Sequence, residues 1–197
     1  MEFPVPENEA ERLRALEDYE IVGSEPEQAF DDLAELAAQI CECPVASVNI
    51  ISEKHRWMKA CYGLPVSIAD APRGSSSCKW TVCQSDLLIV PDMSLDDRFR
   101  DVPYVTGPPH VRFYAGAPLI NPQGYALGTI CVVDFEPRVL RPEQAEALRR
   151  VARQVVGQLE LRRLVMALRE ADRERVVQKR RIEELLLSIL PPGIAEV

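Results

Sequence analysis

Residues 111–134 constrain the fold most, because they have the pattern of two long strands joined by a turn. Apolar residues occupy alternate positions from Val111 to Leu119, and a second apolar run covers residues 127–134. Between them, residues 121–124 read Asn-Pro-Gln-Gly, the residue types with which chains reverse direction. Period-two alternation followed by a glycine-bearing turn predicts an antiparallel β-hairpin.

The flanking segments predict helices and further strands. A short amphipathic helix is expected over residues 9–20, and a second helix starts with Ser24 as its N-cap and runs to Ile40. The other expected elements are strands over 45–51, 56–61 and 87–90, a short helix over 77–83, and a helix from Pro142 to Leu190. Two stretches rich in Pro, Gly, Ser and Asp, 63–77 and 92–109, read as long loops. This order predicts an α+β domain with an antiparallel sheet.

Composition excludes several classes of protein. The formal net charge of −8 disfavours a nucleic-acid partner. No apolar run is long enough to span a bilayer, and the acidic N-terminus has no signal-peptide core, so a cytoplasmic location with no membrane partner is expected. The six cysteines are then expected to be reduced thiols. Their spacing and the two distant histidines do not fit a metal site.

Several segments of residues 24–160 together resemble the GAF domain family of small-ligand sensors. The most specific pair is Arg-Phe-Tyr-Ala-Gly-Ala-Pro-Leu at 112–119 with Leu-Gly-Thr-Ile-Cys-Val-Val-Asp at 127–134. The other segments in pattern are 30–38, 73–78, 90–92, 97–99 and 137–140. The resemblance implies a sheet of about six antiparallel strands, with helices on one face and a loop-covered pocket on the other.

Pocket residues can be nominated within that expected fold. Small residues in the hairpin strands leave space beside the sheet, and the loops 63–77 and 92–109 are long enough to cover it. The candidate lining residues are Trp57, Cys78, Trp80, Asp92, Phe99, Phe113, Ala115, Ala117, Thr129 and Cys131. Packing in the core is the alternative role for each of them.

The ligands of the GAF family can be compared with these residues. A bilin needs a cysteine that is usually followed by histidine, whereas Lys79 follows Cys78 and Gln84 follows Cys83. Haem ligation could come only from His55 or His110, and the signature of cyclic-nucleotide-binding members is missing. We therefore expect neither bilin nor haem, and leave the small-molecule ligand open. Thiol-based redox sensing remains open to Cys78 or Cys131.

The last predicted helix has the heptad pattern of a coiled coil. Taking residue 161 as position a, the a and d positions hold Leu161, Leu164, Leu168, Ala171, Arg175, Gln178, Ile182, Leu185 and Ile189. All are apolar except Arg175 and Gln178, which favours a parallel homodimer with one polar interruption. That interruption is a candidate switch point between two helix packings. A solvated helix that only links domains is the alternative.

The C-terminal residues resemble the entrance to a catalytic domain. Residues 185–195, Leu-Leu-Leu-Ser-Ile-Leu-Pro-Pro-Gly-Ile-Ala, resemble the junction at which a helix enters the catalytic domain of class III adenylate and guanylate cyclases. The alternative is a Pro-Pro pair that simply ends a helix. The resemblance implies four parts: an N-terminal extension (1–23), a GAF sensor (24–160), a coiled-coil signalling helix (161–190) and the start of a catalytic domain (191–197).

We therefore expect a regulatory and dimerisation module of a nucleotide cyclase, most simply an adenylate cyclase that makes cAMP from ATP. These residues carry no catalytic motif, so the catalytic residues of such an enzyme would lie in a covalently linked downstream output domain. A histidine kinase or diguanylate cyclase as the output, or a stand-alone ligand-binding or redox protein, remain the alternatives.

Overall fold

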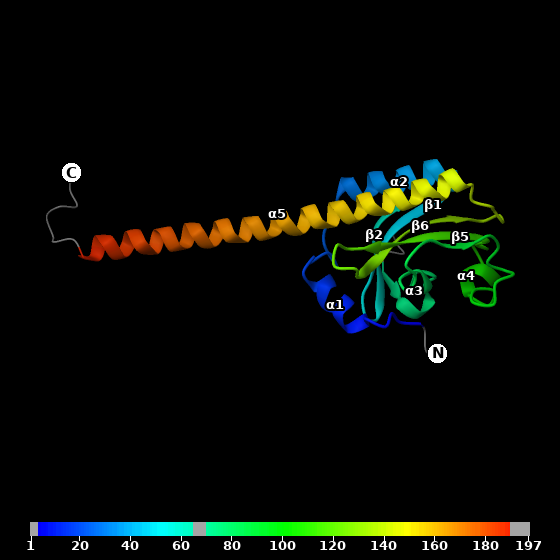
Figure 1. The fold of residues 1–197 in the computed structure, drawn as a ribbon, viewed down its shortest axis with the longest axis horizontal. Helices are drawn as coiled ribbons and strands as arrows, with labels where there is room; N and C mark the ends of the chain where they lie inside the picture. Colours follow the sequence, from blue (N-terminus) through cyan, green and yellow to red (C-terminus); the bar gives the residue numbers. More distant parts are fainter. Residues whose placement is uncertain (1–3, 65–69, 190–197) are drawn as a thin grey trace. The chain divides into compact units, whose positions relative to one another are not determined.

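The computed structural model describes residues 4–64 and 70–189, which contain a six-stranded antiparallel sheet (Figure 1). The strands are β1 (Val45–Ile51), β2 (His55–Tyr62), β3 (Asp70–Pro72), β4 (Leu88–Val90), β5 (Phe113–Ile120) and β6 (Ala126–Asp134). Their order across the sheet is β3-β2-β1-β6-β5-β4. The predicted α+β class and the β5–β6 hairpin are therefore confirmed, since Phe113 pairs with Asp134 and Ile120 with Ala126.

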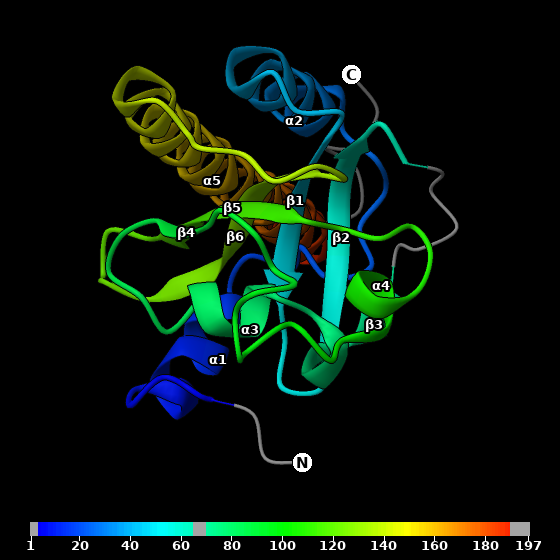
Figure 2. The ribbon, with the colours of Figure 1, turned by 90° about the vertical axis from the view of Figure 1, so that its right-hand side faces the viewer.

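Two helices cover one face of this sheet. Figure 2 shows α2 (Gln28–Cys41) and the first part of α5 (Pro142–Ile189) lying together on that face, with the short helices α3 (Cys78–Thr81) and α4 (Pro103–Thr106) on the other. The main core joins Phe30 of α2 to Ile130 and Val132 of β6 and to Leu148 and Val155 of α5, all at most 1% exposed. Fully burying such side chains contributes about 1.5–3 kcal/mol each.

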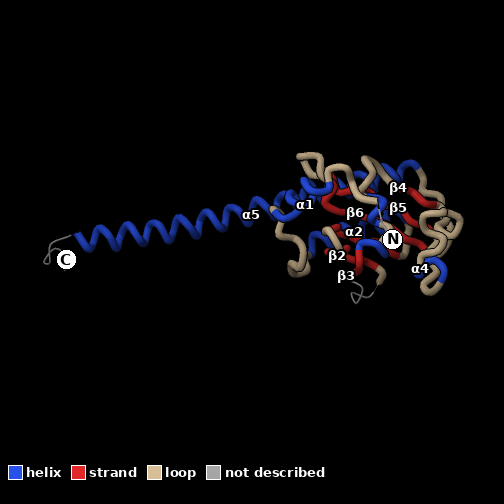
Figure 3. The backbone as a smooth tube through the Cα atoms, turned by 90° about the horizontal axis from the view of Figure 1, so that it is seen from below, coloured by secondary structure: helices blue, strands red, loops and turns tan. Residues whose placement is uncertain are grey.

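The strands alternate between the two faces, as period-two geometry requires. On β5, Phe113, Ala115 and Ala117 pack in the core under α2 and α5, whereas Tyr114 packs on the opposite face. Figure 3 distinguishes the strands from the loops and short helices that surround them. This opposite face carries a second, smaller core that includes Met93, Phe99 and Tyr114.

Three short elements lie within segments that the sequence pattern predicts as loops. Strand β3 forms the edge of the sheet next to β2, the 3-10 helix η2 (Arg73–Ser75) follows it, and α4 lies within 92–109. All three are too short to show a helical or strand periodicity. The predicted N-cap of α2 is wrong: α2 begins after Glu27, and the Ser24 hydroxyl instead accepts a hydrogen bond from Lys59 Nζ at 2.8 Å.

The N-terminal helix α1 (Glu9–Glu17) is anchored by a buried arginine. Arg12 is fully buried, and its guanidinium donates to the carbonyl oxygens of Ile51 at 2.7 Å and Ala126 at 3.2 Å. Glu9 pairs with both Arg12 and Arg73, and Leu16 packs in the main core. The segment before the sheet is thus tied to the ends of β1 and β6.

The chain divides into two compact units, Met1–Glu160 and Leu161–Val197. Helix α5 runs through the division as one continuous helix to Ile189, which confirms the long predicted C-terminal helix. In the second unit, the side chains at the predicted seam positions from Leu161 to Leu185 are exposed in the single chain. The side chain of Ile189 and the whole of residues 190–197, including the predicted catalytic start, lie outside the described residues.

Candidate functional site

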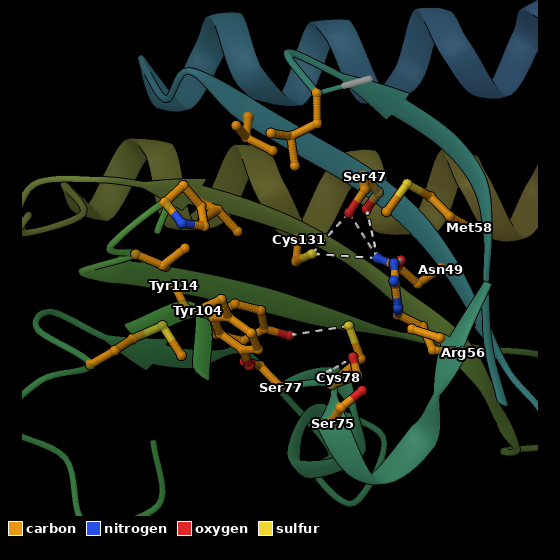
Figure 4. A pocket seen from close by; sticks show the side chains of 18 of the residues that line it. Ser47, Asn49, Arg56, Met58, Ser75, Ser77, Cys78, Tyr104, Tyr114 and Cys131 are labelled. Carbon is orange, nitrogen blue, oxygen red and sulfur yellow. Dashed lines mark hydrogen bonds between the residues drawn. The ribbon is translucent and has the colours of Figure 1, made fainter. Parts of the chain in front are cut away.

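A pocket of about 330 Å³ lies on the sheet face opposite α2 and α5 (Figure 4). Its floor comes from β1, β2, β5 and β6, and its walls come from the segments before α3 and around α4. The lining residues are Val45, Ser47, Asn49, Arg56, Met58, Leu64, Ala71, Ser75, Ser76, Ser77, Cys78, Met93, Pro103, Tyr104, Pro109, Val111, Tyr114, Cys131 and Val133. The pocket therefore lies between the sheet and the described parts of the predicted covering segments 63–77 and 92–109, and residues 65–69 of the first segment lie outside the described residues.

Strand alternation decides which side chains reach the pocket. On β1, Val45, Ser47 and Asn49 face it, while the intervening Ala46 and Val48 pack in the main core. On β6, Cys131 and Val133 face the pocket, while Ile130 and Val132 face α2 and α5. A single residue of register shift would exchange the two sets.

One side of the pocket carries a chain of hydrogen bonds from a guanidinium group to a thiol. Arg56 Nη1 donates to Asn49 Oδ1 at 3.0 Å, and Asn49 Nδ2 donates to Ser47 Oγ at 2.9 Å. Asn49 Nδ2 and Ser47 Oγ also lie 3.4 Å and 3.3 Å from Cys131 Sγ. Figure 4 shows these side chains converging on Cys131. Because Ser47 and Asn49 are almost fully buried, this network is held rigidly.

Two tyrosines provide the polar groups on the facing side. The Tyr104 hydroxyl hydrogen-bonds Ser77 Oγ at 2.6 Å, and the Tyr114 hydroxyl hydrogen-bonds Thr81 Oγ1 at 2.7 Å. Burial raises the pKa of Tyr104 to about 12 and raises the pKa of Tyr114 well above its ordinary value. Both phenols are therefore neutral at physiological pH and can donate hydrogen bonds.

The two cysteines in the pocket have pKa values shifted in opposite directions. A hydrogen bond from Cys131, stronger than the opposing effect of burial and assisted by nearby hydroxyls and the charge of Arg56, lowers the pKa of Cys78 from 9.0 to about 6. The same hydrogen bond, together with burial and repulsion between like charges, raises the pKa of Cys131 well above 9.0. These opposite shifts favour Cys78 over Cys131 as the thiolate.

The wall before α3 is fixed from outside the pocket. Arg73 is almost fully buried; its guanidinium pairs with Glu9, and its backbone N–H donates to the Lys54 carbonyl at 2.8 Å. The four residues after Gly74, namely Ser75, Ser76, Ser77 and Cys78, all line the pocket. The N-terminal helix thus holds one wall of the site in place.

Most residues nominated from the sequence lie outside this lining. Cys78 and Cys131 are in it, whereas Phe113, Ala115 and Ala117 are in the main core, against which Trp57 also packs. Trp80 and Phe99 belong to the second core. Asp92 accepts hydrogen bonds from Ser94, and Thr129 is fully buried within β6.

The space expected beside the small strand residues is occupied. A side chain at Gly116 would meet the Tyr114 hydroxyl and Thr81 Oγ1, and one at Gly128 would meet the Asn49 carbonyl oxygen at 2.0 Å. The small residues therefore permit close packing and strand pairing rather than leaving a cavity. The sequence pattern did not single out Ser47, Asn49, Arg56, Tyr104 and Tyr114, although Ser47 and Asn49 alternate with apolar residues in a buried strand.

Among the seam positions of α5, Arg175 has a local partner, and the apolar positions are exposed. Arg175 pairs with Asp172 at 3.2 Å, one turn earlier on the helix surface. Leu164, Leu168 and Ile182 are 61%, 71% and 57% exposed, and their heptad spacing makes them one apolar stripe, a kind of surface that marks interaction sites.

Within the described residues, no helix is long and apolar enough to cross a membrane, and no cluster of three metal-ligating side chains is found.

The chain has relatives of known sequence and structure. It is 36% identical over 135 residues to the cyclic di-GMP phosphodiesterase PA2567 of Pseudomonas aeruginosa; the match covers 68% of this chain but only 23% of that protein. The chain thus spans about a quarter of the length of this relative.

Solved structures share the fold. The GAF domain of the Acinetobacter phosphoenolpyruvate-protein phosphotransferase is 17% identical with a TM-score of 0.58, covering 79% of this chain and 95% of that one. The free methionine-R-sulfoxide reductase of Neisseria meningitidis, solved with its substrate, is 14% identical with a TM-score of 0.57, covering 84% and 98%. The GAF domain family model matches residues 25–159. This chain therefore belongs to the GAF domain family.

Proposed function

We propose that this chain is a small-molecule sensor, in which binding of a ligand in the pocket controls an output domain through α5. The observation that carries this proposal is the pocket of about 330 Å³ with apolar walls and a preformed polar side. Its volume is at the lower end of the range for ligand sites. Its ligand is a small molecule with an apolar body and one polar group, which the Ser47–Asn49 network and the neutral tyrosines would orient.

Strand β6 is the element through which the pocket can act on the helix. Cys131 and Val133 face the pocket, and the intervening Val132 packs in the same core as Val151 and Val155 of α5. A ligand that displaces β6 must therefore repack the contact with α5. Because packed cores switch between discrete arrangements, a small shift here can be passed on.

We propose that α5 then forms a parallel coiled coil with a second copy of the chain. The exposed leucines and isoleucine at heptad positions support this, because a seam that is apolar along most of its length is buried only by a partner. In the assembled dimer, Arg175 and Gln178 would lie together at the seam and define the switch point.

For the output domain, we propose a class III nucleotide cyclase. Its support is the junction pattern in residues 185–195. The second candidate is a cyclic di-GMP phosphodiesterase, favoured by the name of the 36% identical relative. A histidine kinase or diguanylate cyclase would use the same coupling. Assay of the full-length protein with ATP, GTP and cyclic di-GMP distinguishes these outputs by product.

A thermal-shift screen with small neutral aromatic and aliphatic alcohols and amides tests the pocket. Compounds that raise the melting temperature of the wild-type chain should lose this effect in Ala71→Phe, because the larger side chain fills the pocket. Ile89→Phe places a larger side chain on β4, outside the lining, and should leave the ligand-induced rise in melting temperature intact. Equal shifts in both variants would place binding elsewhere.

A further inference from the structure

Two cysteines that are distant in sequence meet at the pocket. Cys78 is the first residue of α3 and Cys131 is central in β6, and both side chains line the same pocket. Cys131 Sγ lies 3.3 Å from Ser47 Oγ and 3.4 Å from Asn49 Nδ2, and Cys78 Sγ accepts a hydrogen bond from the Tyr114 hydroxyl at 3.8 Å. Figure 4 shows both sulfurs facing the same pocket. Both side chains are only 3–4% exposed, so the pocket is the path by which a small reagent reaches them.

The other four cysteines have a different environment. Cys41, Cys43, Cys61 and Cys83 are not among the lining residues, and burial raises the pKa of each, to about 11 for Cys41 and about 12 for Cys43. They stay protonated at neutral pH, and a thiol reacts far more slowly than a thiolate.

We propose that Cys78 and Cys131 form a redox-active pair, which a hydroperoxide entering the pocket oxidises to a disulfide. Cys78 is the attacking residue and Cys131 the resolving residue. Ser47 and Asn49 are positioning residues for the Cys131 sulfur, and Tyr114 is the positioning residue for the Cys78 sulfur.

The reaction balances in two steps. The Cys78 thiolate attacks one peroxide oxygen; an S–O bond forms, the O–O bond breaks, and the leaving hydroxide or alkoxide takes a proton to become water or an alcohol. Cys131 sulfur then attacks the Cys78 sulfenic acid; an S–S bond forms, the S–O bond breaks, and the released hydroxide takes the Cys131 proton to become water. The two thiols lose two electrons, and the peroxide gains them.

The opposite directions of the two pKa shifts favour Cys78 as the residue that attacks first. The groups around Cys78 are Cys131, Tyr104, Tyr114 and Arg56, of which Arg56 favours the thiolate and the phenols stay neutral. While Cys78 carries the charge, Cys131 keeps its proton. Once Cys78 is a neutral sulfenic acid, its negative charge no longer adds to the effect of burial on the pKa of Cys131, and the Cys131 sulfur acts as the nucleophile while its proton passes to the leaving hydroxide.

The consequence would be a covalent link between α3 and β6. Because β6 packs on α5, oxidation would act on the element through which the proposed sensor signals. The chemistry does not depend on the identity of a non-covalent ligand or of the output domain, so its test is separate from the test of the sensor proposal.

The test uses the whole 197-residue chain, reduced and then treated with hydrogen peroxide. Remaining thiols are blocked with N-ethylmaleimide, and non-reduced proteolytic peptides are mapped by mass spectrometry. We expect a Cys78–Cys131 cross-linked peptide that disappears on reduction, and loss of the free Cys78 thiol at least about tenfold faster than loss of Cys83.

Two variants separate the roles. In Cys131→Ser, Cys78 should stop at the sulfenic acid, which dimedone traps as a stable adduct. In Cys83→Ser, which removes a half-buried cysteine outside the lining, the Cys78–Cys131 disulfide should form at the wild-type rate. The proposal is overturned if wild-type protein forms no Cys78–Cys131 peptide, or if Cys61 or Cys83 is oxidised before Cys78.

Discussion

Glu9 lies between two buried guanidinium groups, those of Arg12 and Arg73. Burial by itself would raise the pKa of Glu9, but hydrogen bonds and charges from the two arginines outweigh it and lower the pKa from 4.5 to about 2. A group whose pKa is lower in the folded state stabilises that state when ionised. This contribution is present above about pH 4.5 and is lost as the pH falls toward 2.

We therefore expect Glu9→Gln to lower the free energy of unfolding at pH 7 by about 2 kcal/mol, since it leaves two buried cations without their charged acceptor. Urea unfolding at several pH values measures this. The difference from wild type should shrink as the pH approaches 2. Glu11→Gln, which removes an exposed carboxylate paired with Arg14, should change the free energy of unfolding by less than about 0.5 kcal/mol. A pH-independent loss in Glu9→Gln would contradict the ion-pair explanation.

Substitution of two glycines gives a second prediction about single residues. Gly128 lies where β6 pairs with β1, and an added Cβ would come within 2.0 Å of the Asn49 carbonyl oxygen. Gly128→Ala should therefore destabilise the fold by about 3 kcal/mol or more. Gly157 lies within α5, and an added Cβ would meet nothing within 4 Å. Gly157→Ala should stabilise by about 0.5–1 kcal/mol because alanine favours helix. Thermal unfolding of both variants compares them directly, and equal effects would refute the close strand approach.

Among the elements, α5 combines two environments in one helix. Its first part is buried by the sheet through Leu148, Val151 and Val155, whereas the residues after Glu160 belong to the second unit. Most helical stability in proteins comes from packing of an apolar face. The exposed apolar seam of the second unit therefore favours a partner helix.

The polar pair Arg175 and Gln178 makes this testable. Replacing both with leucine should tighten the parallel dimer by on the order of 1 kcal/mol or more per site, because polar seam groups are exchanged for aliphatic ones. Sedimentation equilibrium measures the change. The control is Arg173→Leu with Arg180→Leu, which adds leucines at the outermost heptad positions and should leave dimerisation unchanged.

The same double variant bears on signalling in the full-length protein. A more tightly packed coiled coil should reduce the ratio of output activity with and without the stimulus toward one. If the dimer is tighter and this ratio is unchanged, the polar interruption is not the switch point.

For the whole molecule, the central question is whether the second unit holds two copies together. We expect the 197-residue chain to sediment as a dimer and a variant ending at Glu160 to sediment as a weaker dimer or a monomer. Because the sheet and its two cores lie in the first unit, the shorter variant removes only the second unit, and a change in association reports on that unit. If the 197-residue chain is a monomer at about 100 μM, the coiled-coil proposal is excluded, since specific contacts commonly have micromolar affinity.

The sequence by itself determined the features that repeat along the chain. Alternation over 111–119 and 127–134 predicted the β5–β6 hairpin, and an unbroken run without proline predicted α5. Both follow from local geometry: a strand or helix must place its apolar side chains on one face, and that spacing is visible without any other part of the protein.

The composition of the pocket was decided only by tertiary structure. Phe113 and Ala115 belong to the same strand as Tyr114, but only Tyr114 faces the pocket, because α2 and α5 cover the other face. Likewise, the pocket brings Cys78 and Cys131 together, and Arg12 reaches the carbonyl groups of Ile51 and Ala126, so residues far apart along the chain become neighbours. Such contacts depend on strand order and on which face each helix covers. No local pattern carries that information, since it exists only once the sheet has assembled.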